Sequence, residues 1–424
     1  LPAAGEAPMA VIERLAAAAD AGVMASAGPR FFGFVVGATL PAALAADWLA
    51  STWDQNAGLY VLAPAAAVVE EAAGAWIAEL VGLPATASVG FVTGCQAANF
   101  SALAAARHEL LARAGWDVES RGLYGAPEIE VVVGEEAHVT VHTALQMLGL
   151  GRERVRRVAV DGQGRMRAEA LAEALAPLAG RPVLVCAQAG NVNTGAFDPL
   201  PEIADLARAC GAWLHVDGAF GLWAGASRAL RPLLSGVERA DSWATDAHKW
   251  LNVPYDSGLV FCAHPGAHRG ALTATASYLE QTEGRERDPF EWTPEFSRRA
   301  RGFAVWAALR SLGRDGVEEL VDRGAGHARR FAEILGAQPG IEILNEVVLN
   351  QVLVRFAPPA GGDAGASDEF TRETIRRVQA SGELWLSGTT WQKKAAMRIS
   401  VSGWRTTAAD VERSAAAILA AAGR

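Results

Sequence analysis

Cysteine is scarce in this sequence, and the spacings that bind zinc or mark a redox pair are missing. The four cysteines, Cys95, Cys186, Cys210 and Cys262, form no CxxC pair, and three of them lie in apolar runs. Disulfides persist in oxidising compartments and are rare in the cytosol. We therefore expect buried, unpaired thiols and a cytoplasmic protein.

Long apolar runs and an excess of basic residues are also absent. No stretch holds the roughly 18 uninterrupted apolar residues that a bilayer-spanning helix needs, and no secretion signal is evident. The 424 residues carry a formal net charge of -9, which disfavours a nucleic-acid surface and attraction to a membrane. We expect neither nucleic acid nor membrane as a partner.

Several catalytic and metal-binding motifs are incomplete. His138 and His142 are four residues apart, but no glutamate between them completes an HExxH pattern, so we expect no metal site. Residues 225–229 (GASRA) lack the final glycine of the nucleophile elbow found in many serine hydrolases. No Walker phosphate-binding loop occurs.

The middle of the chain alternates short β-rich runs with amphipathic helical runs. Continuous apolar strands separated by helices predict an α/β fold with a mostly parallel sheet covered on both faces. The expected strands are Ser88–Thr93, Ile129–Val133, Val155–Val160, Val183–Cys186, Trp213–Val216, Ser242–Thr245 and Gly258–Cys262, and expected helices include Ala97–Arg113 and Pro201–Cys210.

The pattern changes toward both ends of the chain. Residues 1–60 combine helix and loop and predict an N-terminal arm, which leaves residues 61–311 for the large domain. From 312 onward, a helix near Val317–Leu335 precedes an apolar segment, Ile341–Phe356, a Gly/Pro-rich loop, another helix and strands near Leu384 and Met397. Residues 312–424 therefore predict a smaller α+β domain.

Polar residues fall where several expected strands end, and ligands bind at such ends in open α/β sheets. Asp217 ends one strand, His138 follows another, and Lys249 lies between the last two. The segment 93–96 (TGCQ) joins a strand to a helix whose first turn would offer free N–H groups to an anion. A lysine, a carboxylate and an anion site match the needs of pyridoxal phosphate: the lysine forms the Schiff base, and the carboxylate keeps the ring nitrogen protonated.

Five sequence blocks extend this match to a known family. From about Gly28 to the C-terminus, the chain resembles the group II pyridoxal-phosphate decarboxylases, which include the aromatic amino acid and glutamate decarboxylases. The resemblance rests on residues 29–33 (PRFFG), 93–99 (TGCQAAN), 190–198 (GNVNTGAFD), 215–219 (HVDGA) and 241–249 (DSWATDAHK). It implies fold type I, the aspartate aminotransferase-like fold of pyridoxal-phosphate enzymes, and a homodimer.

The resemblance also implies roles for residues of these blocks. Lys249 would carry the cofactor, Asp217 would pair with the ring nitrogen, and His138 would stack on the ring opposite Ala219. Asn191 stands where the family has a threonine near the ring hydroxyl. The residues expected around the phosphate are Gly94, Cys95, Gln96, Thr245 and His248. Cys95 and Gln96 replace a glycine and a hydroxyl residue, so we expect the backbone to supply more of the phosphate contact.

Tyr278 resembles the family's mobile-loop tyrosine, which would donate the proton that completes decarboxylation; a loop anchor is its alternative role. Arg298 aligns with a family arginine and is expected to brace the lid or a dimer partner, and Arg398 with one that meets a substrate carboxylate. For both, the alternative is a structural salt bridge. Phe31, Phe32 and Tyr60 would line an apolar substrate pocket unless they belong to the core.

Three functions are therefore compared. The first is decarboxylation of an L-amino acid, aromatic or otherwise hydrophobic, to the amine and CO2. The second is another fold type I reaction, by an aminotransferase or a decarboxylation-dependent aldehyde synthase, which loss of the Tyr278 role would favour. The third is a non-catalytic scaffold, against which the presence of Lys249, Asp217 and His138 argues.

Overall fold

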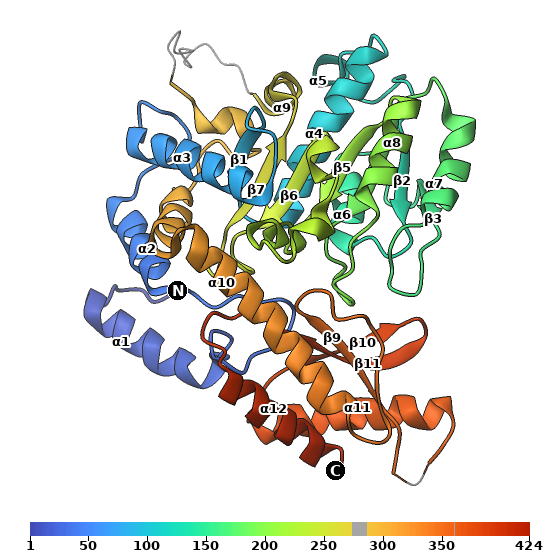
Figure 1. The fold of residues 1–424 in the computed structure, drawn as a ribbon. Coiled ribbons are helices and arrows are strands. Elements are labelled where there is room, and N and C mark those ends of the chain that lie inside the picture. The colour runs from blue at the N-terminus through green and yellow to red at the C-terminus, as the bar shows by residue number, and fades with distance from the viewer. Residues whose placement is uncertain (274–285, 360) are drawn as a thin grey trace.

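The computed structural model describes residues 1–273, 286–359 and 361–424 (Figure 1). In these ranges the α-helices are α1 (Pro8–Ala19), α2 (Pro41–Trp53), α3 (Pro64–Val81), α4 (Cys95–Arg113), α5 (Val118–Arg121), α6 (Val139–Met147), α7 (Ala168–Leu175), α8 (Leu200–Cys210), α9 (Pro265–Leu272), α10 (Gly302–Gly336), α11 (Ala364–Ser381) and α12 (Ala408–Ala421). The strands are β1 (Ser88–Val92), β2 (Glu130–Gly134), β3 (Val155–Val158), β4 (Val183–Gln188), β5 (Trp213–Asp217), β6 (Ser242–Asp246), β7 (Gly258–Cys262), β8 (Ile341–Ile343), β9 (Gln351–Phe356), β10 (Ser387–Trp391) and β11 (Lys394–Ser400).

The large sheet has the strand order β1-β7-β6-β5-β4-β2-β3. Strand β7 runs antiparallel to both of its neighbours, while β6, β5, β4, β2 and β3 pair in parallel. The predicted α/β fold with a mostly parallel sheet is confirmed, and every expected strand of this sheet is present with slightly shifted ends. Because β1 also runs parallel to β6, the carboxyl ends of β1, β2, β4, β5 and β6 lie at one edge.

Helices cover both faces of this sheet, as Figure 1 shows. Side chains of a strand alternate between its two faces. In β2, Val131 and Val133 pack in one apolar cluster with Leu103 of α4 and Leu145 of α6, whereas Val132 packs in another that includes residues of α3, α7, α8 and α10. Burial on both faces explains why these strands read as continuous apolar runs.

The small sheet is antiparallel in the order β10-β11-β9-β8. Its core includes Phe331 of α10 and Phe356 of β9. Helix α10 extends from the large sheet to the small one (Figure 1) and bends at Gly313, where φ is 63° and ψ is -177°. The boundaries proposed from sequence, 60/61 and 311/312, stay a prediction, and the second boundary falls inside α10 beside this bend.

The N-terminal arm lies directly against the loop that carries Lys249. A Cβ atom on Gly37 would sit 1.9 Å from the carbonyl oxygen of Lys249, so glycine is needed for this approach. Asn252, three residues on from the lysine, accepts the N–H of Ala38 at 2.9 Å and the N–H of Trp404 at 2.9 Å through Oδ1. This buried amide joins the arm, the lysine loop and the small domain.

Candidate active site

The predicted site residues from four strand ends meet at the carboxyl edge of the large sheet. Lys249 follows β6, and Asp217 ends β5. His138 immediately precedes α6, after β2, and Cys95 begins α4, after β1. Asp217 and His138 line the same cavity. The sheet order places these groups together because β5 and β6 are neighbours and β1 and β2 flank them on opposite sides.

Lys249 forms an ion pair beneath the site. Its Nζ lies 2.9 Å from Oδ2 of Asp246, and its side chain is 20% exposed. Burial alone would lower the pKa of Lys249, but attraction to Asp246, with a smaller contribution from Asp217, outweighs it and raises the pKa. The amine is therefore held charged until a ligand changes its surroundings.

Asp246 is a site residue to which the sequence analysis gave no role. Its Oδ1 accepts the backbone N–H of Cys95 at 2.6 Å and lies 3.5 Å from Nε2 of His248. Helix α4 has no side-chain cap from Gly94, so the Asp246 carboxylate supplies an acceptor at its positive end. In the sequence, its aspartate within the 241–249 block could have indicated that Asp246 belongs to the site.

Asp217 is almost fully buried and accepts hydrogen bonds at both oxygens. Oδ1 receives the N–H of Ala219 at 3.1 Å and the thiol of Cys95 at 3.4 Å. Oδ2 receives Nδ2 of Asn99 at 3.1 Å. Burial and the two aspartates nearby raise the pKa of Cys95, which keeps the thiol a donor. Because a carboxylate has about four lone-pair sites, Asp217 can accept a further N–H.

His138 is oriented by the start of α6. Its Nδ1 accepts the N–H of Thr140 at 3.4 Å and lies 2.8 Å from the hydroxyl of Thr140. Burial lowers the pKa of His138, against the opposing influence of Asp217. A neutral imidazole with a fixed ring orientation is suited to stacking on a planar ligand.

The phosphate-side residues predicted from sequence surround the start of α4. Gln96 lies exposed in its first turn, and Gly94 approaches the beginning of β7, where a Cβ on Gly258 would come within 2.5 Å of the Gly94 Cα. His248 accepts the N–H of Ser257 at 3.1 Å through Nδ1, and burial lowers its pKa. The hydroxyl of Thr245 donates to the Ala219 carbonyl at 3.5 Å.

Asn191 is buried in the loop after β4. Its Oδ1 accepts the N–H groups of Asn193 and Thr194 at 2.9 and 3.1 Å. Its Nδ2 has no hydrogen-bond partner within the part of the chain that the structure describes. An unpaired buried donor is costly, so this amide is available to a ligand.

Arg398 projects from β11 of the small domain and is only 8% exposed. Its Nη1 donates to the Val192 carbonyl at 3.3 Å and to Oδ1 of Asn193 at 3.5 Å, and its Nε is buried without a partner in the described ranges. Burial lowers the pKa of Arg398. No carboxylate of the described residues lies within ion-pair distance of this guanidinium. These residues therefore do not show the alternative role, a structural salt bridge.

The aromatic residues predicted for the substrate pocket lie in different places. Phe32 is 1% exposed and packs edge to face with Phe331, 5.1 Å between ring centroids, in the core of the small domain. The prediction that Phe32 lines the pocket is therefore wrong, because its ring fills that core. Phe31 stacks on Trp385 at 4.9 Å, and the backbone N–H of Tyr60 donates to Asp288 at 2.7 Å.

Two aromatic residues near the site were missed. Phe34, at φ 56°, is 59% exposed and lies on the segment that reaches Lys249 through Gly37. The ring of Tyr255 lies 4.4 Å from that of His248. No periodicity marks such loop positions, although the PRFFG block adjoins Phe34. Tyr278, the predicted proton donor, lies outside the described residues.

For Arg298 the described residues show the alternative role given above, a structural salt bridge. Arg298 forms a buried ion pair with Glu70 at 2.8 Å and donates to the carbonyls of Ala57 at 2.7 Å and Phe91 at 2.6 Å. Its guanidinium thus holds β1 to the arm and to α3 within the chain.

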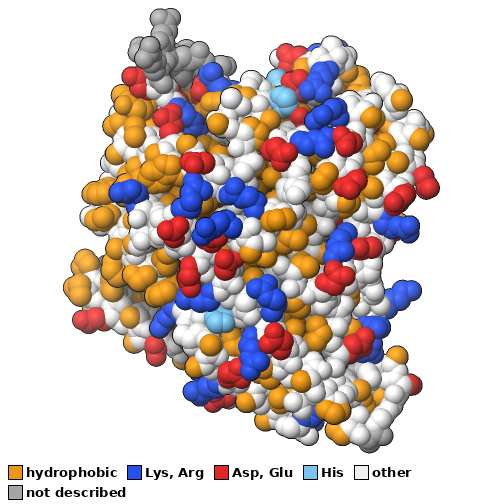
Figure 2. Space-filling view, viewed as in Figure 1, with side chains coloured by type: hydrophobic (Ala, Val, Ile, Leu, Met, Phe, Trp, Pro, Cys, Tyr) orange, Lys and Arg blue, Asp and Glu red, His pale blue; other side chains and the backbone are white. Residues whose placement is uncertain are grey.

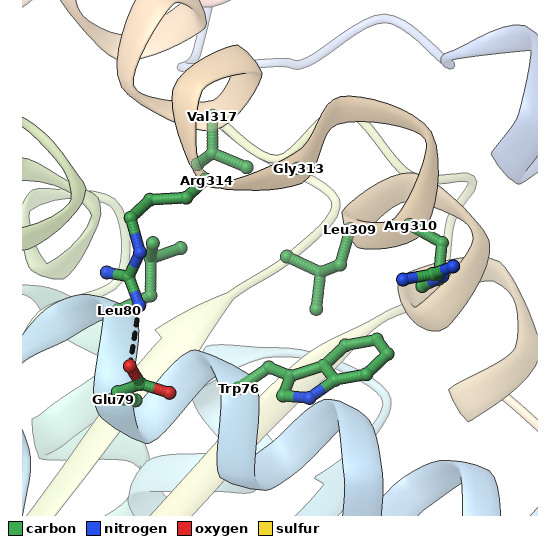
Figure 3. A pocket seen from close by; sticks show the side chains of 8 residues that line it. All are labelled: Trp76, Glu79, Leu80, Leu309, Arg310, Gly313, Arg314 and Val317. Atoms are coloured by element: carbon green, nitrogen blue, oxygen red, sulfur yellow. Dashed lines mark hydrogen bonds and ion pairs between the residues drawn. The ribbon is translucent and has the colours of Figure 1, made fainter.

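A separate surface pocket of about 190 Å³ lies between α3 and the bend of α10 (Figure 3). Trp76, Leu309 and Val317 line it, and Arg314 pairs with Glu79 at its rim at 2.6 Å. None of its lining residues belongs to the site predicted from sequence. Within the described ranges, no group of three or more His, Cys, Asp or Glu side chains is placed to hold a metal ion, and no described helix is long and apolar enough to cross a membrane.

The residues at the sheet edge fit pyridoxal phosphate. Lys249 offers the amine, and Asp217 has acceptor capacity for a ring N–H. The neutral imidazole of His138 can cover a ring face, and the unpaired Nδ2 of Asn191 can donate to a ring substituent. At the start of α4, where Asp246 accepts the N–H of Cys95, further N–H groups of the first turn can receive a phosphate.

Comparison with known proteins agrees with a pyridoxal phosphate site at these residues. Residues 1–357 match the pyridoxal-dependent decarboxylase conserved domain. The chain is 28% identical over 385 residues to an aromatic-L-amino-acid decarboxylase of Bacillus atrophaeus, covering 89% of this chain and 78% of that protein. It is 32% identical over 353 residues to an acidic amino acid decarboxylase of Bos taurus, covering 81% and 66%.

Solved structures with the same fold include the Oryza sativa TDC with PLP and tryptamine, at a TM-score of 0.93 and 25% identity over 100% of this chain and 89% of that one. Mouse CSAD follows at a TM-score of 0.90 and 25% identity, with 99% and 89% covered. The chain belongs to the pyridoxal-dependent decarboxylase family, whose members are pyridoxal-phosphate-dependent lyases that act on amino acids.

Proposed function

We propose that this enzyme decarboxylates an aromatic or otherwise hydrophobic L-amino acid with a single carboxylate, releasing the amine and CO2. One observation carries the proposal: within the described residues the Arg398 guanidinium is buried, its Nε has no hydrogen-bond partner, and no carboxylate lies within ion-pair distance of it. Lys249 is taken up by the cofactor, which leaves Arg398 to bind one carboxylate. A second carboxylate, on an acidic side chain, would need a further cation.

The exposed ring of Phe34 supports the hydrophobic preference. It lies on the arm segment that contacts the Lys249 loop, and its centroid is 5.3 Å from that of Trp385, on which Phe31 also stacks. These rings form an apolar surface on the arm segment that leads to the Lys249 loop. The Bacillus atrophaeus relative is named for aromatic substrates and the Bos taurus relative for acidic ones, so the family alone leaves the preference open.

The reaction breaks the bond between Cα and the carboxyl carbon, and a proton must replace CO2 at Cα. Bound pyridoxal phosphate supplies the electron sink that accepts the bonding pair. Lys249 anchors the ligand, Asp217 holds a proton at the ring nitrogen, and His138 covers a ring face. Arg398 orients the substrate, and we propose Tyr278 as the donor of the proton to Cα.

The test is a mass-spectrometric product screen of the standard L-amino acids with added pyridoxal phosphate. We expect an amine lighter than its parent by one CO2, formed fastest from an aromatic or branched apolar substrate. Arg398→Gln should lower kcat/KM about 100-fold, because a charged hydrogen-bonding partner is lost. Arg329→Gln, at an exposed arginine of α10, serves as the control.

Other products would decide between the alternatives. Fastest release of an amine from aspartate or glutamate would contradict the hydrophobic preference. A keto acid or an aldehyde would favour the aminotransferase or aldehyde-synthase reaction, and would remove Tyr278 as the donor to Cα.

The exposed apolar residues of the arm support a homodimer. Helix α1 buries no residue within the chain, and Met9, Ile12 and Leu15 are exposed on it. Figure 2 shows hydrophobic side chains gathered at the left edge, over α1, α2 and α3. Exposed apolar patches of this extent mark association surfaces. The unpaired cysteines support a reducing cytoplasmic location.

A further inference from the structure

A chain of fully buried polar side chains lies beneath Asp217. Nδ2 of Asn99 donates to Asp217 at 3.1 Å, and Oδ1 of Asn99 lies 2.9 Å from Nε2 of His215. Nδ1 of His215 lies 3.0 Å from the hydroxyl of Ser242, which accepts Nε1–H of Trp213 at 2.9 Å. The residues are supplied by α4, β5 and β6.

The hydrogen bonds of this chain all run in one direction. Nδ2 of Asn99 donates to Asp217, so the Asn99 oxygen that faces Nε2 of His215 must accept a proton from it. In a neutral ring Nδ1 of His215 is then an acceptor, so Ser242 donates to it while it accepts from Trp213. The other nitrogen of His215 then carries the ring proton and donates to Oδ1 of Asn99. Burial lowers the pKa of His215 to about 4, so the ring holds one proton, as this arrangement requires.

A branch of the same chain reaches His138. Nδ2 of Asn99 also lies 3.3 Å from Oγ1 of Thr140 and donates to it. The Thr140 hydroxyl lies 2.8 Å from Nδ1 of His138, to which it can donate its own proton. The Thr140 backbone N–H faces the same nitrogen. Nδ1 of His138 is an acceptor in this network, which places the ring proton on Nε2.

We propose that Asn99 is a positioning residue that orients the Asp217 carboxylate and, through Thr140, supports one tautomer of His138. Its single amide presents a donor to the carboxylate and to the Thr140 hydroxyl. The group that would pair with the ring nitrogen and the group that would cover a ring face are thereby coupled through one side chain. The proposal rests on the family's cofactor chemistry and is independent of the substrate preference proposed above.

The test compares Asn99→Ala and Ser242→Ala with the control Ser101→Ala. Ser101 is buried on the same helix, and its hydroxyl donates only to the Ala97 carbonyl. The readouts are the dissociation constant of pyridoxal phosphate, the pH dependence of its bound absorption, and the melting temperature without cofactor. None of them needs a substrate, so they stay informative whatever the product screen finds.

We expect Asn99→Ala to raise the dissociation constant about tenfold and to shift the midpoint of the absorption titration, because a hydrogen bond to a charged group is lost. Ser242→Ala should raise the dissociation constant about threefold, and Ser101→Ala should raise it less than about twofold. If Asn99 had a purely structural role, Asn99→Ala would lower the melting temperature, but its absorption midpoint would equal that of Ser101→Ala. That result would overturn the proposal.

The branch is tested separately in case Asn99→Ala does not fold. Thr140 is only partly buried, and Thr140→Val removes its hydroxyl while keeping its shape. The absorption midpoint should shift in this variant, and Thr140→Ser should restore it. Equal midpoints for Thr140→Val and the wild type would contradict the coupling of Asn99 to His138.

Discussion

Lys249 is one of only three lysines in the sequence, with Lys393 and Lys394, although arginine is frequent. Its neighbours in the 241–249 block predicted the cofactor role that the family assignment supports. The sequence could not reveal the Asp246 ion pair, because a carboxylate three residues away meets the lysine only in a particular turn. Similarly, the asparagine of the 93–99 block carried no sign that its side chain lies under Asp217.

Replacing Asp246 should change the pH at which Lys249 reacts. The folded environment raises the pKa of Lys249, so its reactive neutral form is depleted as pH falls below that value. In Asp246→Asn the pKa of Lys249 should drop, because the carboxylate is its main opposing charge. We expect the rate of covalent pyridoxal phosphate attachment to reach its midpoint at lower pH.

Stopped-flow absorbance over a pH series measures this shift. Asp256→Asn is the control, since Asp256 lies in the same loop but pairs with Arg301 at 2.7 Å. An Asp246→Asn midpoint equal to or above that of the wild type would show that Asp246 does not set the pKa of the lysine.

At the scale of elements, alternation of strands and helices predicted the large sheet well, because buried parallel strands read as continuous apolar runs. The arm was predicted poorly in detail. Phe32 and Phe34 are two residues apart, yet one fills a core and the other is exposed. Positive φ angles at Phe34 and Val35 turn the chain there, and no sequence period encodes that turn.

Docking of the arm should depend on Gly37. In Gly37→Ala the added Cβ would collide with the Lys249 carbonyl, and overpacking of this kind typically costs about 1–3 kcal/mol. We expect a lower melting temperature, faster proteolysis of the arm and weaker cofactor binding. Gly22→Ala is the matched control, because no atom lies within 4 Å of a Cβ at that arm position.

The two variants separate docking from general effects of a methyl group in the arm. Equal melting temperatures and proteolysis rates for Gly37→Ala and Gly22→Ala would contradict a role of the close approach to Lys249.

At the scale of the molecule, the family resemblance anticipated the fold and the cofactor, while composition bounded only the broad class. A dimer could not be derived from one chain's apolar pattern, because buried and interface residues look alike in sequence. In the structure, α1 has an apolar face that its own chain leaves uncovered.

The homodimer is tested by light scattering of the wild type and of Leu15→Glu. We expect twice the chain mass for the wild type and a shift toward the monomer for the variant, because a charge is costly in an apolar interface. Tyr124→Glu is the control, as that side chain is fully exposed on the large domain. A wild-type monomer at micromolar concentration would refute the homodimer.

The most direct test of the whole account is borohydride reduction of the enzyme with pyridoxal phosphate, followed by peptide mass spectrometry. The account predicts a pyridoxyl mass on Lys249 and none on Lys393 or Lys394, since only Lys249 lies at the carboxyl edge of the large sheet. Labelling of Lys393 or Lys394 instead, or no labelled lysine at all, would contradict it.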